Sequence, residues 1–341
     1  MGLNKESGIK IGRGTPGARN LITDVPGVKV GHVTIRDGAD VNTGVTAILP
    51  HEGNLFQEKV MASSCVINGF GKTMGLVQVE ELGTIETPII MTNTLSIGTA
   101  ATALIKYMLQ QNEDIGTKTG TVNPLVCECN DGVLNDIRGL HVKEEHVFEA
   151  LANCSEDFAE GVVGSGTGMC CLGLKGGIGS ASRIVKLDDK EYTVGALVMS
   201  NFGGAGRLLI EGRHMGQEIK EKLEAQQDKG SIIMLIATDI PLSERQLKRV
   251  ARRAAVGLAR TGSYYGNGSG DIAIAFTTAN RVPHYSKTAV MDMKMLADSK
   301  IDPVFDMAAE AVEEAIISSL YHAETTTGRA GKVKYGLRDF L

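Results

Sequence analysis

The junction between a charged segment and a long apolar run constrains the fold of this chain more than any other segment. It reads KGSIIMLIA and runs from Lys229 to Ala237. Gly230 ends the charged segment, and Ser231 begins a run rich in β-branched residues. An apolar run of this length after a glycine predicts a β-strand that starts at Ser231. The fold must therefore place a hydroxyl at the first position of a strand, directly after a loop.

The order Gly-Ser before a strand also has a chemical meaning. Glycine permits strained backbone geometries, in which the Ser231 hydroxyl can attack the carbonyl of the peptide bond that precedes it. Cleavage there would leave Ser231 with a free α-amine, whose pKa of roughly 8 suits a local base. The alternative is a strand that simply begins with Gly-Ser, and this short motif alone does not distinguish the two.

Further blocks of sequence accompany this junction in a fixed order. They are LITDVPGVKVGH at 21–32, VGALVMSNFG at 194–203 and the glycine-rich TGSYYGNGSGD at 261–271. Together they resemble the family of L-aminopeptidase/D-esterases and β-aminopeptidases (DmpA/BapA), whose members mature by autoproteolysis. The resemblance extends from about Ile22 to about Asn280.

The resemblance implies an α/β fold, a four-layer αββα sandwich in which two β-sheets are covered by helices on both outer faces. The residue pattern also favours short strands joined by glycine-rich turns over regular βαβ winding. We expect one domain over 1–341, cut into 1–230 and 231–341. Apolar periodicity predicts the following elements: strands at 44–50, 87–92, 192–199, 231–238 and 271–278, and helices at 96–111, 143–152, 243–258 and 303–321.

Helix-end signals refine two of these predictions. Ser243 and Gln246 form a capping box, so a helix should begin there. Asp302 is placed to cap the last helix, with Pro303 at its first position. The charged, Gln-rich segment 214–230 precedes the candidate cleavage site, and we expect it to be an exposed loop.

The resemblance also assigns catalytic roles, with Ser231 as nucleophile and Gly230–Ser231 as the cleaved bond. Asn201 matches the family's oxyanion residue, and an amide group supplies uncharged donors for that purpose. Ser269 and Asp271 match a serine and an acidic residue that lie beside the nucleophile. Positions two apart on an extended chain share a face, so the hydroxyl can relay a proton while the carboxylate holds the new ammonium.

Glu128 matches the acidic residue that faces the free amine of the substrate in the family. Two nearby positions depart from the family pattern. Lys72 stands where an acidic residue is expected, and Asn130 stands close to where an aromatic residue is expected. These departures concern substrate preference and leave the nucleophile unaffected. We expect Asp131 and Gly132 to form only a turn.

Composition excludes several other classes of protein. The net charge of −5 does not suggest a polyanion partner, and the basic positions 248–253 are typical of a solvated helix face. No apolar stretch is long enough to span a membrane. Six cysteines and seven histidines lack zinc-ligand spacing, so we expect buried thiols, no metal and no cofactor. The Gly-Lys-Thr triplet at 71–73 and the glycine-rich segment at 164–168 lack the spacing of nucleotide-binding loops.

The resemblance therefore implies a self-processing serine aminopeptidase or amidase that removes an N-terminal residue from short peptides, amides or esters, and we expect it to be cytoplasmic. The resemblance further implies a homo-oligomer, a tetramer of processed heterodimers. An acetyltransferase of the ornithine acetyltransferase type is one alternative, although that branch is expected to use threonine in place of Ser231. A non-catalytic glycine-rich binding protein is the other. Denaturing electrophoresis separates the alternatives, because a binding protein stays one band.

Overall fold

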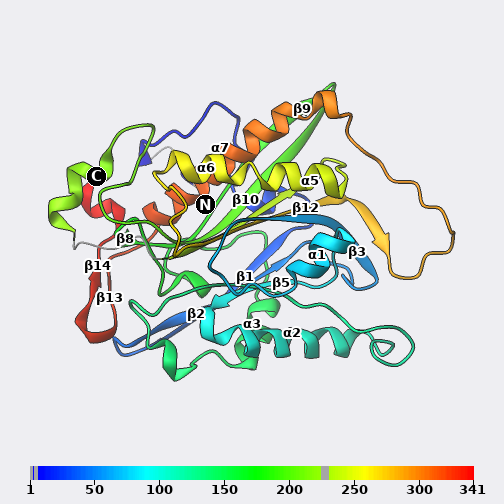
Figure 1. Cartoon of the computed structure of the whole chain (residues 1–341), viewed down its shortest axis with the longest axis horizontal. Coiled ribbons are helices and arrows are strands. Elements are labelled where there is room, and N and C mark those ends of the chain that lie inside the picture. Colours follow the sequence, from blue (N-terminus) through cyan, green and yellow to red (C-terminus); the bar gives the residue numbers. More distant parts are fainter. Residues whose placement is uncertain (1–2, 4–6, 224–229) are drawn as a thin grey trace.

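Two β-sheets form the centre of the molecule (Figure 1). The computed structural model describes residues 3, 7–223 and 230–341. The six-stranded sheet has the order β4-β3-β12-β11-β10-β9, and the four-stranded sheet has the order β1-β2-β5-β6. The bounds of these strands are β1 Lys29–Asp37, β2 Val41–Leu49, β3 Glu58–Gly69, β4 Thr84–Ile85, β5 Ile89–Asn93, β6 Leu125–Cys129, β9 Gly177–Leu187, β10 Lys190–Asn201, β11 Ser231–Thr238 and β12 Gly270–Pro283.

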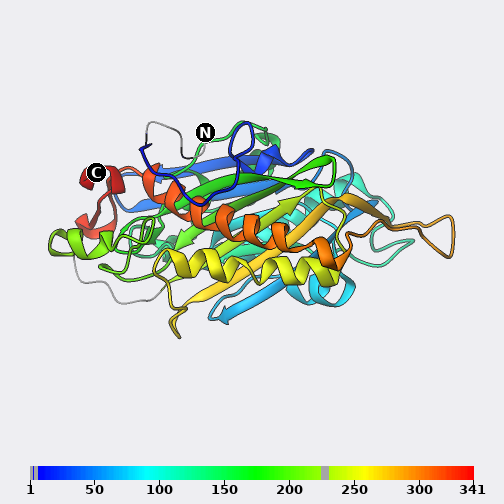
Figure 2. The ribbon, with the colours of Figure 1, turned by 90° about the horizontal axis from the view of Figure 1, so that it is seen from above.

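Helices cover the outer face of each sheet, so the molecule has four layers (Figure 1). Helices α5–α7 lie over the six-stranded sheet, and α7 runs across it (Figure 2). Helices α2 and α3 cover the four-stranded sheet. The helix bounds are α1 Leu76–Leu82, α2 Ile97–Gln111, α3 Glu144–Ala152, α4 Met215–Ile219, α5 Glu244–Ala251, α6 Ala254–Arg260 and α7 Asp302–Tyr321. The predicted αββα sandwich is confirmed.

Side-chain alternation along β11 explains why this strand is apolar from Ile232 to Ala237. Ile232 and Met234 pack in the core beneath the helices, whereas Ile233 and Leu235 pack in the core between the two sheets. Every residue of β11 is buried, as expected for a central strand covered on both faces. The alternation also places the side chain of Ser231 on the inter-sheet face, at the end where the strand begins.

The structure differs from the predicted helices in two places. The helix expected over 243–258 breaks at Arg252 and Arg253 into α5, which packs on β3 and β12, and α6, which packs on α7. The expected capping box at its start is present. The last helix begins at Asp302 itself, with Ile301 at the capping position, so the predicted Asp302 cap is wrong by one residue. The expected loop at 214–230 contains the short helix α4, and its residues 224–229 lie outside the described residues.

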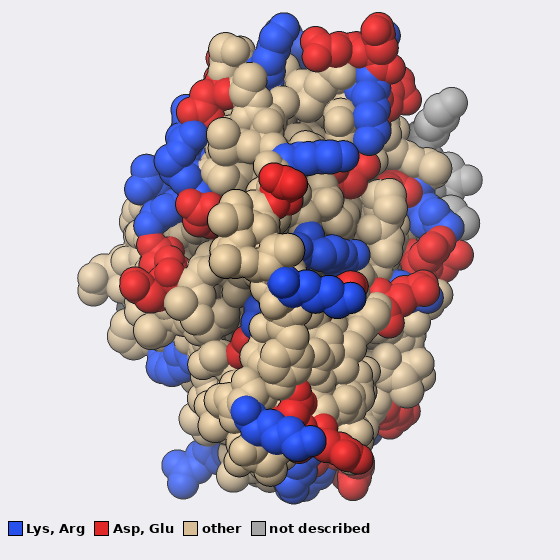
Figure 3. Space-filling view, turned by 90° about the vertical axis from the view of Figure 1, so that its right-hand side faces the viewer, with Lys and Arg blue, Asp and Glu red and all other residues tan. Residues whose placement is uncertain are grey.

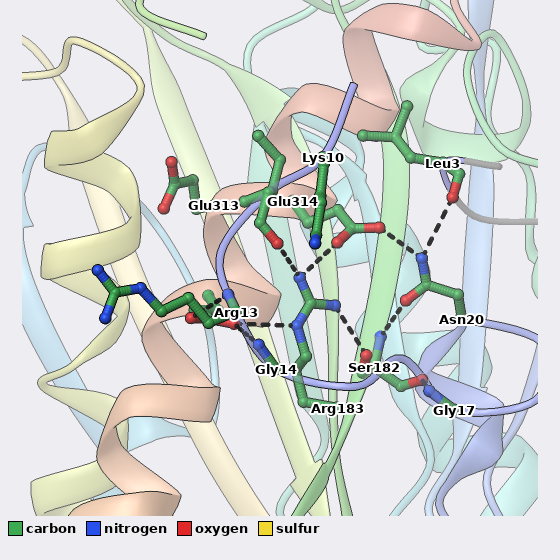
Figure 4. Close-up of polar contacts among 12 residues, drawn as sticks. Leu3, Lys10, Arg13, Gly14, Gly17, Asn20, Ser182, Arg183, Glu313 and Glu314 are labelled. Atoms are coloured by element: carbon green, nitrogen blue, oxygen red, sulfur yellow. Dashed lines mark hydrogen bonds and ion pairs between the residues drawn. The ribbon is translucent and has the colours of Figure 1, made fainter. Parts of the chain in front are cut away.

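A buried polar cluster joins the N-terminal segment, β9 and α7 (Figure 4). The fully buried guanidinium of Arg183 lies 3.2 Å from Glu310 and forms a second ion pair with Glu314. Glu310 in turn accepts hydrogen bonds from the backbone N–H groups of Arg13 and Gly14, both at 2.8 Å. The cluster therefore fixes the segment before β1 onto the helical layer.

Candidate active site

Ser231 begins the central strand β11, between β10 and β12. In the strand register it lies opposite Asn201 on the antiparallel side and Gly270 on the parallel side. Opposite residues of an antiparallel pair have Cβ atoms about 5 Å apart on the same face. The serine hydroxyl and the asparagine amide, which the sequence predicted to act together, are therefore cross-strand neighbours.

This pair lines a cavity of about 630 Å³. The walls come from β11 and β10, from the segment after β3, and from the end of β6 and the loop that follows it. Ser231 is 6% exposed and Asn201 is 5% exposed, so both residues are almost completely buried where they line the cavity. The lining residues are Phe70, Lys72, Thr94, Glu128, Asn130, Gly132, Val133, Ile137, Asn201, Gly230, Ser231 and Gly268.

The side chain of Asn201 is fixed at both ends of its amide. Its Oδ1 accepts a hydrogen bond of 2.8 Å from the backbone N–H of Cys170. Its Nδ2 donates one hydrogen to the carbonyl of Asn130 at 2.9 Å. An amide nitrogen carries two hydrogens, and among the described residues nothing accepts the second. Asn201 is therefore held in one orientation, and its second Nδ2 hydrogen can donate to a group bound in the cavity.

The peptide bond before Ser231 is itself held by a neighbouring strand. The backbone N–H of Gly270 lies 3.1 Å from the carbonyl oxygen of Gly230 and 3.3 Å from Ser231 Oγ. One donor thus contacts both the carbonyl that would be attacked and the hydroxyl that would attack it. Lys229, at the other end of the predicted junction, lies outside the described residues.

Gly230 is required by close packing. A Cβ at this position would lie 1.9 Å from the carbonyl oxygen of Asn201. Its φ is outside the left-handed region that favours glycine, so the strained geometry expected from the sequence is not the reason for this residue. The reason is the approach of the chain to β10.

Ser269 and Asp271 flank Gly270 and contact each other. Ser269 Oγ donates to Asp271 Oδ1 at 2.7 Å, and both side chains are buried. This hydrogen bond confirms that the two residues share a face, as their spacing predicted. Strand alternation places that face with Ala273, towards the helical layer, whereas Ser231 faces the inter-sheet layer. The pair is therefore connected to Ser231 through Gly270, whose backbone N–H contacts Ser231 Oγ.

Glu128 enters the cavity from the end of β6 and is only 2% exposed. Its Oε1 accepts a hydrogen bond of 2.8 Å from the backbone N–H of Lys72, and its Oε2 accepts one from Thr94 Oγ1. An ionised carboxylate has about four acceptor positions, so it can still receive an ammonium group. The arrangement holds a carboxyl group in one orientation in the same cavity as Ser231.

Lys72 and Asn130, the two residues that depart from the family pattern, each make a defined contact near the cavity. The ammonium of Lys72 lies 4.6 Å from the centre of the Phe70 ring, while its backbone N–H donates a hydrogen bond to Glu128. Asn130 closes a turn by accepting the N–H of Gly132 at 2.9 Å. Asp131 does more than form the expected turn, because its buried carboxylate accepts a hydrogen bond of 2.6 Å from Thr43. Burial raises the pKa of Asp131 to about 6.

Sequence reasoning missed the groups that orient the predicted side chains. Thr94 and the N–H groups of Lys72, Cys170 and Gly270 carry no signal in a single sequence, because three of the four are backbone donors. Thr94 lies two positions after the strand predicted at 87–92, and that position was the clue available in the sequence.

Other kinds of site were searched for over the described part of the chain. There, no group of three His, Cys, Asp or Glu side chains is placed to hold a metal ion. Among the same residues, no helix is both long and apolar enough to cross a bilayer. All six cysteines are free thiols, and burial raises the pKa of Cys127, Cys154 and Cys171 to about 12, so these thiols are poor nucleophiles.

Comparison with known proteins found a matching family and similar chains. Residues 20–334 match the model of peptidase family S58. The β-peptidyl aminopeptidase BapA of Sphingosinicella microcystinivorans is 40% identical over 342 residues, which cover 93% of this chain and 85% of the relative. The BapA of Sphingosinicella xenopeptidilytica is 39% identical, with coverage of 95% and 86%.

Solved structures show the same fold over almost the whole chain. The PH0078 protein of Pyrococcus horikoshii OT3 has a TM-score of 0.95 at 61% identity and covers 98% of this chain and 95% of its own. A β-aminopeptidase of Burkholderia sp. has a TM-score of 0.91 at 40% identity, with coverage of 98% and 95%. The L-aminopeptidase D-Ala-esterase/amidase of Ochrobactrum anthropi has a TM-score of 0.91 at 37% identity, with coverage of 98% and 94%. That enzyme is described as a prototype of the serine aminopeptidases and a variant of the Ntn hydrolase fold.

Proposed function

Because this chain belongs to peptidase family S58, we propose that it is a serine aminopeptidase that activates itself by cleaving the Gly230–Ser231 bond. Its substrates are short peptides, amides or esters with a free N-terminal amine. The observation that supports this most strongly is the cavity itself, which brings together Ser231, Asn201 and Glu128. These three residues supply a nucleophile, an oxyanion donor and a charge that binds an amine.

Self-cleavage begins with attack of Ser231 Oγ on the carbonyl carbon of Gly230. The oxygen of that carbonyl gains negative charge, which the N–H of Gly270 at 3.1 Å stabilises. The C–N bond then breaks, the nitrogen takes a proton, and an ester joins Gly230 to Ser231 Oγ. Water hydrolyses the ester, leaving a carboxylate on Gly230 and both a free hydroxyl and a free amine on Ser231.

Turnover repeats the chemistry on a substrate. Ser231 Oγ attacks the substrate carbonyl, its own α-amine accepts the proton, and the free N–H of Asn201 binds the oxyanion. Ser269 and Asp271 hold the α-amine in place and relay protons from the neighbouring strand. The carboxylate of Glu128 binds the amine of the substrate. The C–N or C–O bond of the substrate then breaks, the α-ammonium of Ser231 gives its proton to the leaving amine or alcohol, and an ester joins the acyl group to Ser231 Oγ. Water hydrolyses this ester, which releases the acyl group as a carboxylate and restores the hydroxyl.

Denaturing electrophoresis and one variant test this proposal. The purified protein is expected to give fragments of 230 and 111 residues, which correspond to roughly 24 and 12 kDa. Ser231→Ala removes the hydroxyl used in both reactions, so it is expected to give one intact, folded and inactive chain. An active wild-type protein that runs as a single band, or amidase activity in Ser231→Ala, would refute the proposal.

We also propose that the processed protein forms a homo-oligomer. The segment that joins β12 to α7 projects from the body (Figure 1) and exposes apolar side chains. These are Tyr285, Val290, Met291, Met293 and Met295. Exposed apolar segments of this kind are typical of contact surfaces. Light scattering after size-exclusion chromatography is expected to give a mass near four processed heterodimers, and a monomer would contradict this.

We further propose that the protein is cytoplasmic and binds neither nucleic acid nor a membrane surface. Charges of both signs are interspersed over the face shown in Figure 3, which supports small substrates over nucleic acid or a membrane surface. Two of the basic residues at 248–253 are engaged within the protein, since the guanidinium groups of Arg249, in α5, and Arg253, between α5 and α6, lie over the Phe305 ring. Six free cysteines fit a reducing compartment, which supports a cytoplasmic location.

A further inference from the structure

Lys175 is a completely buried lysine that the mechanism above does not use. It lies on the short strand β8, Leu174–Lys175, within a glycine-rich segment. Its Nζ donates to three backbone carbonyls, those of Gly166 at 3.1 Å, Met169 at 2.8 Å and Gly176 at 2.7 Å. Burial lowers the pKa of this ammonium to about 7. A charge placed here at such a cost needs an explanation.

One of these carbonyls connects the ammonium directly to the oxyanion residue. The carbonyl of Met169 and the N–H of Cys170 belong to the same peptide group, and in a trans peptide they point in opposite directions. Lys175 binds the carbonyl at 2.8 Å, while Asn201 Oδ1 accepts the N–H at 2.8 Å. A continuous chain of hydrogen bonds therefore runs from the ammonium through one peptide group to the Asn201 amide.

A cation at one end of such a chain strengthens every later member. It draws electron density from the peptide group, which makes the Cys170 N–H a stronger donor, and the same effect passes through the Asn201 amide. The chain ends at the Nδ2 hydrogen that is left for the oxyanion. We propose that Lys175 is a positioning residue that orients and polarises Asn201 for oxyanion stabilisation. This inference rests on the role proposed above for Asn201.

A purely structural role explains the contacts less well. The carbonyl of Met169 already accepts the N–H of Gly176 at 2.9 Å, and the carbonyl of Gly166 already accepts the N–H of Met169 at 3.2 Å. Two of the three carbonyls thus keep a partner without the ammonium. A neutral side chain would fill the space without burying a charge. The same contacts imply that Lys175→Met can still fold.

A double-mutant cycle tests the proposal. Lys175→Met is expected to lower kcat by about tenfold while KM changes less than twofold, because only the transition state uses the oxyanion donor. In an Asn201→Ala background, the same substitution is expected to change kcat less than twofold, since the group it acts through is gone. An equal loss of kcat in both backgrounds, or no loss in either, would overturn the proposal.

A matched control separates stability from catalysis. Lys59 is also a lysine whose pKa is lowered by burial, and it hydrogen-bonds the carbonyl of Phe56 away from the cavity. Lys59→Met is expected to lower the unfolding temperature without changing kcat. Activity of Ser231→Ala would refute the proposed function, whereas full kcat in Lys175→Met would refute only the role of Lys175.

The wild-type enzyme supplies the same test should Lys175→Met fail to fold. An α-aminoalkyl boronic acid forms a negatively charged adduct with a catalytic serine hydroxyl. By reciprocal linkage, an oxyanion that the ammonium stabilises must in turn raise the pKa of Lys175. NMR of the processed enzyme with ¹³C-labelled lysine ε-carbons is expected to show this rise relative to the enzyme without the adduct, in which the same groups, Arg36, Asp131, Cys170 and Cys171, face the ammonium. An unchanged lysine pKa in the adduct would overturn the proposal.

Discussion

Asn201 shows at the scale of one residue how a turn-type side chain becomes a catalytic group. Alone, an asparagine before Phe-Gly-Gly is typical of a turn. In the fold it lies across from Ser231, with its oxygen held by Cys170 and one amide hydrogen held by Asn130. Both contacts orient the amide before any substrate arrives. Preorganised donors of this kind need no rearrangement during the reaction.

Asn201→Ala is therefore expected to lower kcat by about 10²–10³-fold, as for the loss of one oxyanion donor. The fold is expected to stay intact, although the N–H of Cys170 and the carbonyl of Asn130 each lose a partner. Steady-state kinetics and thermal unfolding of the processed variant check both expectations. If the variant does not fold, Asn201 is primarily a structural residue.

Glu128→Gln tests recognition of the amine of the substrate. The amide keeps the size of the side chain but removes its charge, so a bound ammonium loses its counter-ion in a buried site, at a cost of a few kcal/mol. The preference for aminoacyl over N-acetyl-aminoacyl p-nitroanilides should shrink, measured as the ratio of the two kcat/KM values. Thr94→Val is a milder comparison, because it removes one hydrogen bond to Glu128 and keeps the charge. An unchanged ratio in Glu128→Gln would place amine recognition elsewhere.

At the scale of elements, the sequence identified the strands more reliably than the connections between them. The run after Gly230 is apolar enough to predict β11 from its first residue. The family resemblance pointed to Ser269 and Asp271, and their spacing on an extended chain agreed with a shared face. The sandwich itself followed from the family resemblance, since alternation does not say which strands pair. The break between α5 and α6 was missed because apolar spacing continues through it.

The orienting contacts of the site could not be predicted for a different reason. The N–H of Cys170 reaches Asn201 from 31 positions away in sequence, and the N–H of Lys72 reaches Glu128 from 56 positions away. Every residue except proline carries such an N–H, so residue type does not mark these donors. Only the folded arrangement of strands shows which backbone groups are available.

The contact between the start of β11 and the end of β10 yields a prediction for Gly230→Ala. The added Cβ would meet the carbonyl oxygen of Asn201 at 1.9 Å, so the two strands must separate where Ser231 and Asn201 lie opposite each other. Misplacement by about 1 Å can cost about 10²-fold in rate, and we expect self-cleavage to slow by that order. A time course of band intensities measures it. Gly98→Ala, at a helix position with open space around it, is the control and should be cleaved normally.

At the scale of the whole molecule, cleavage at Gly230–Ser231 would divide a single core between two chains. Strand β11 would belong to the second chain, yet it pairs with β10 of the first, and β12 pairs with β3 in the same way. The buried cluster of Figure 4 also crosses the division, because Arg183 belongs to the first chain and Glu310 and Glu314 belong to the second. The products are therefore expected to stay associated.

Arg183→Met tests how far this cluster stabilises the processed protein. It leaves Glu310 and Glu314 buried without a cation, which typically costs about 3–5 kcal/mol. The midpoint of urea unfolding is expected to fall.

In the processed variant the midpoint should also depend on protein concentration, because unfolding now releases two chains. In uncleaved Arg183→Met/Ser231→Ala the midpoint should fall without that dependence. Adding Glu310→Gln and Glu314→Gln to Arg183→Met should restore part of the loss. Unfolding of the processed Arg183→Met protein at the wild-type midpoint would show that strand pairing alone holds the two chains together.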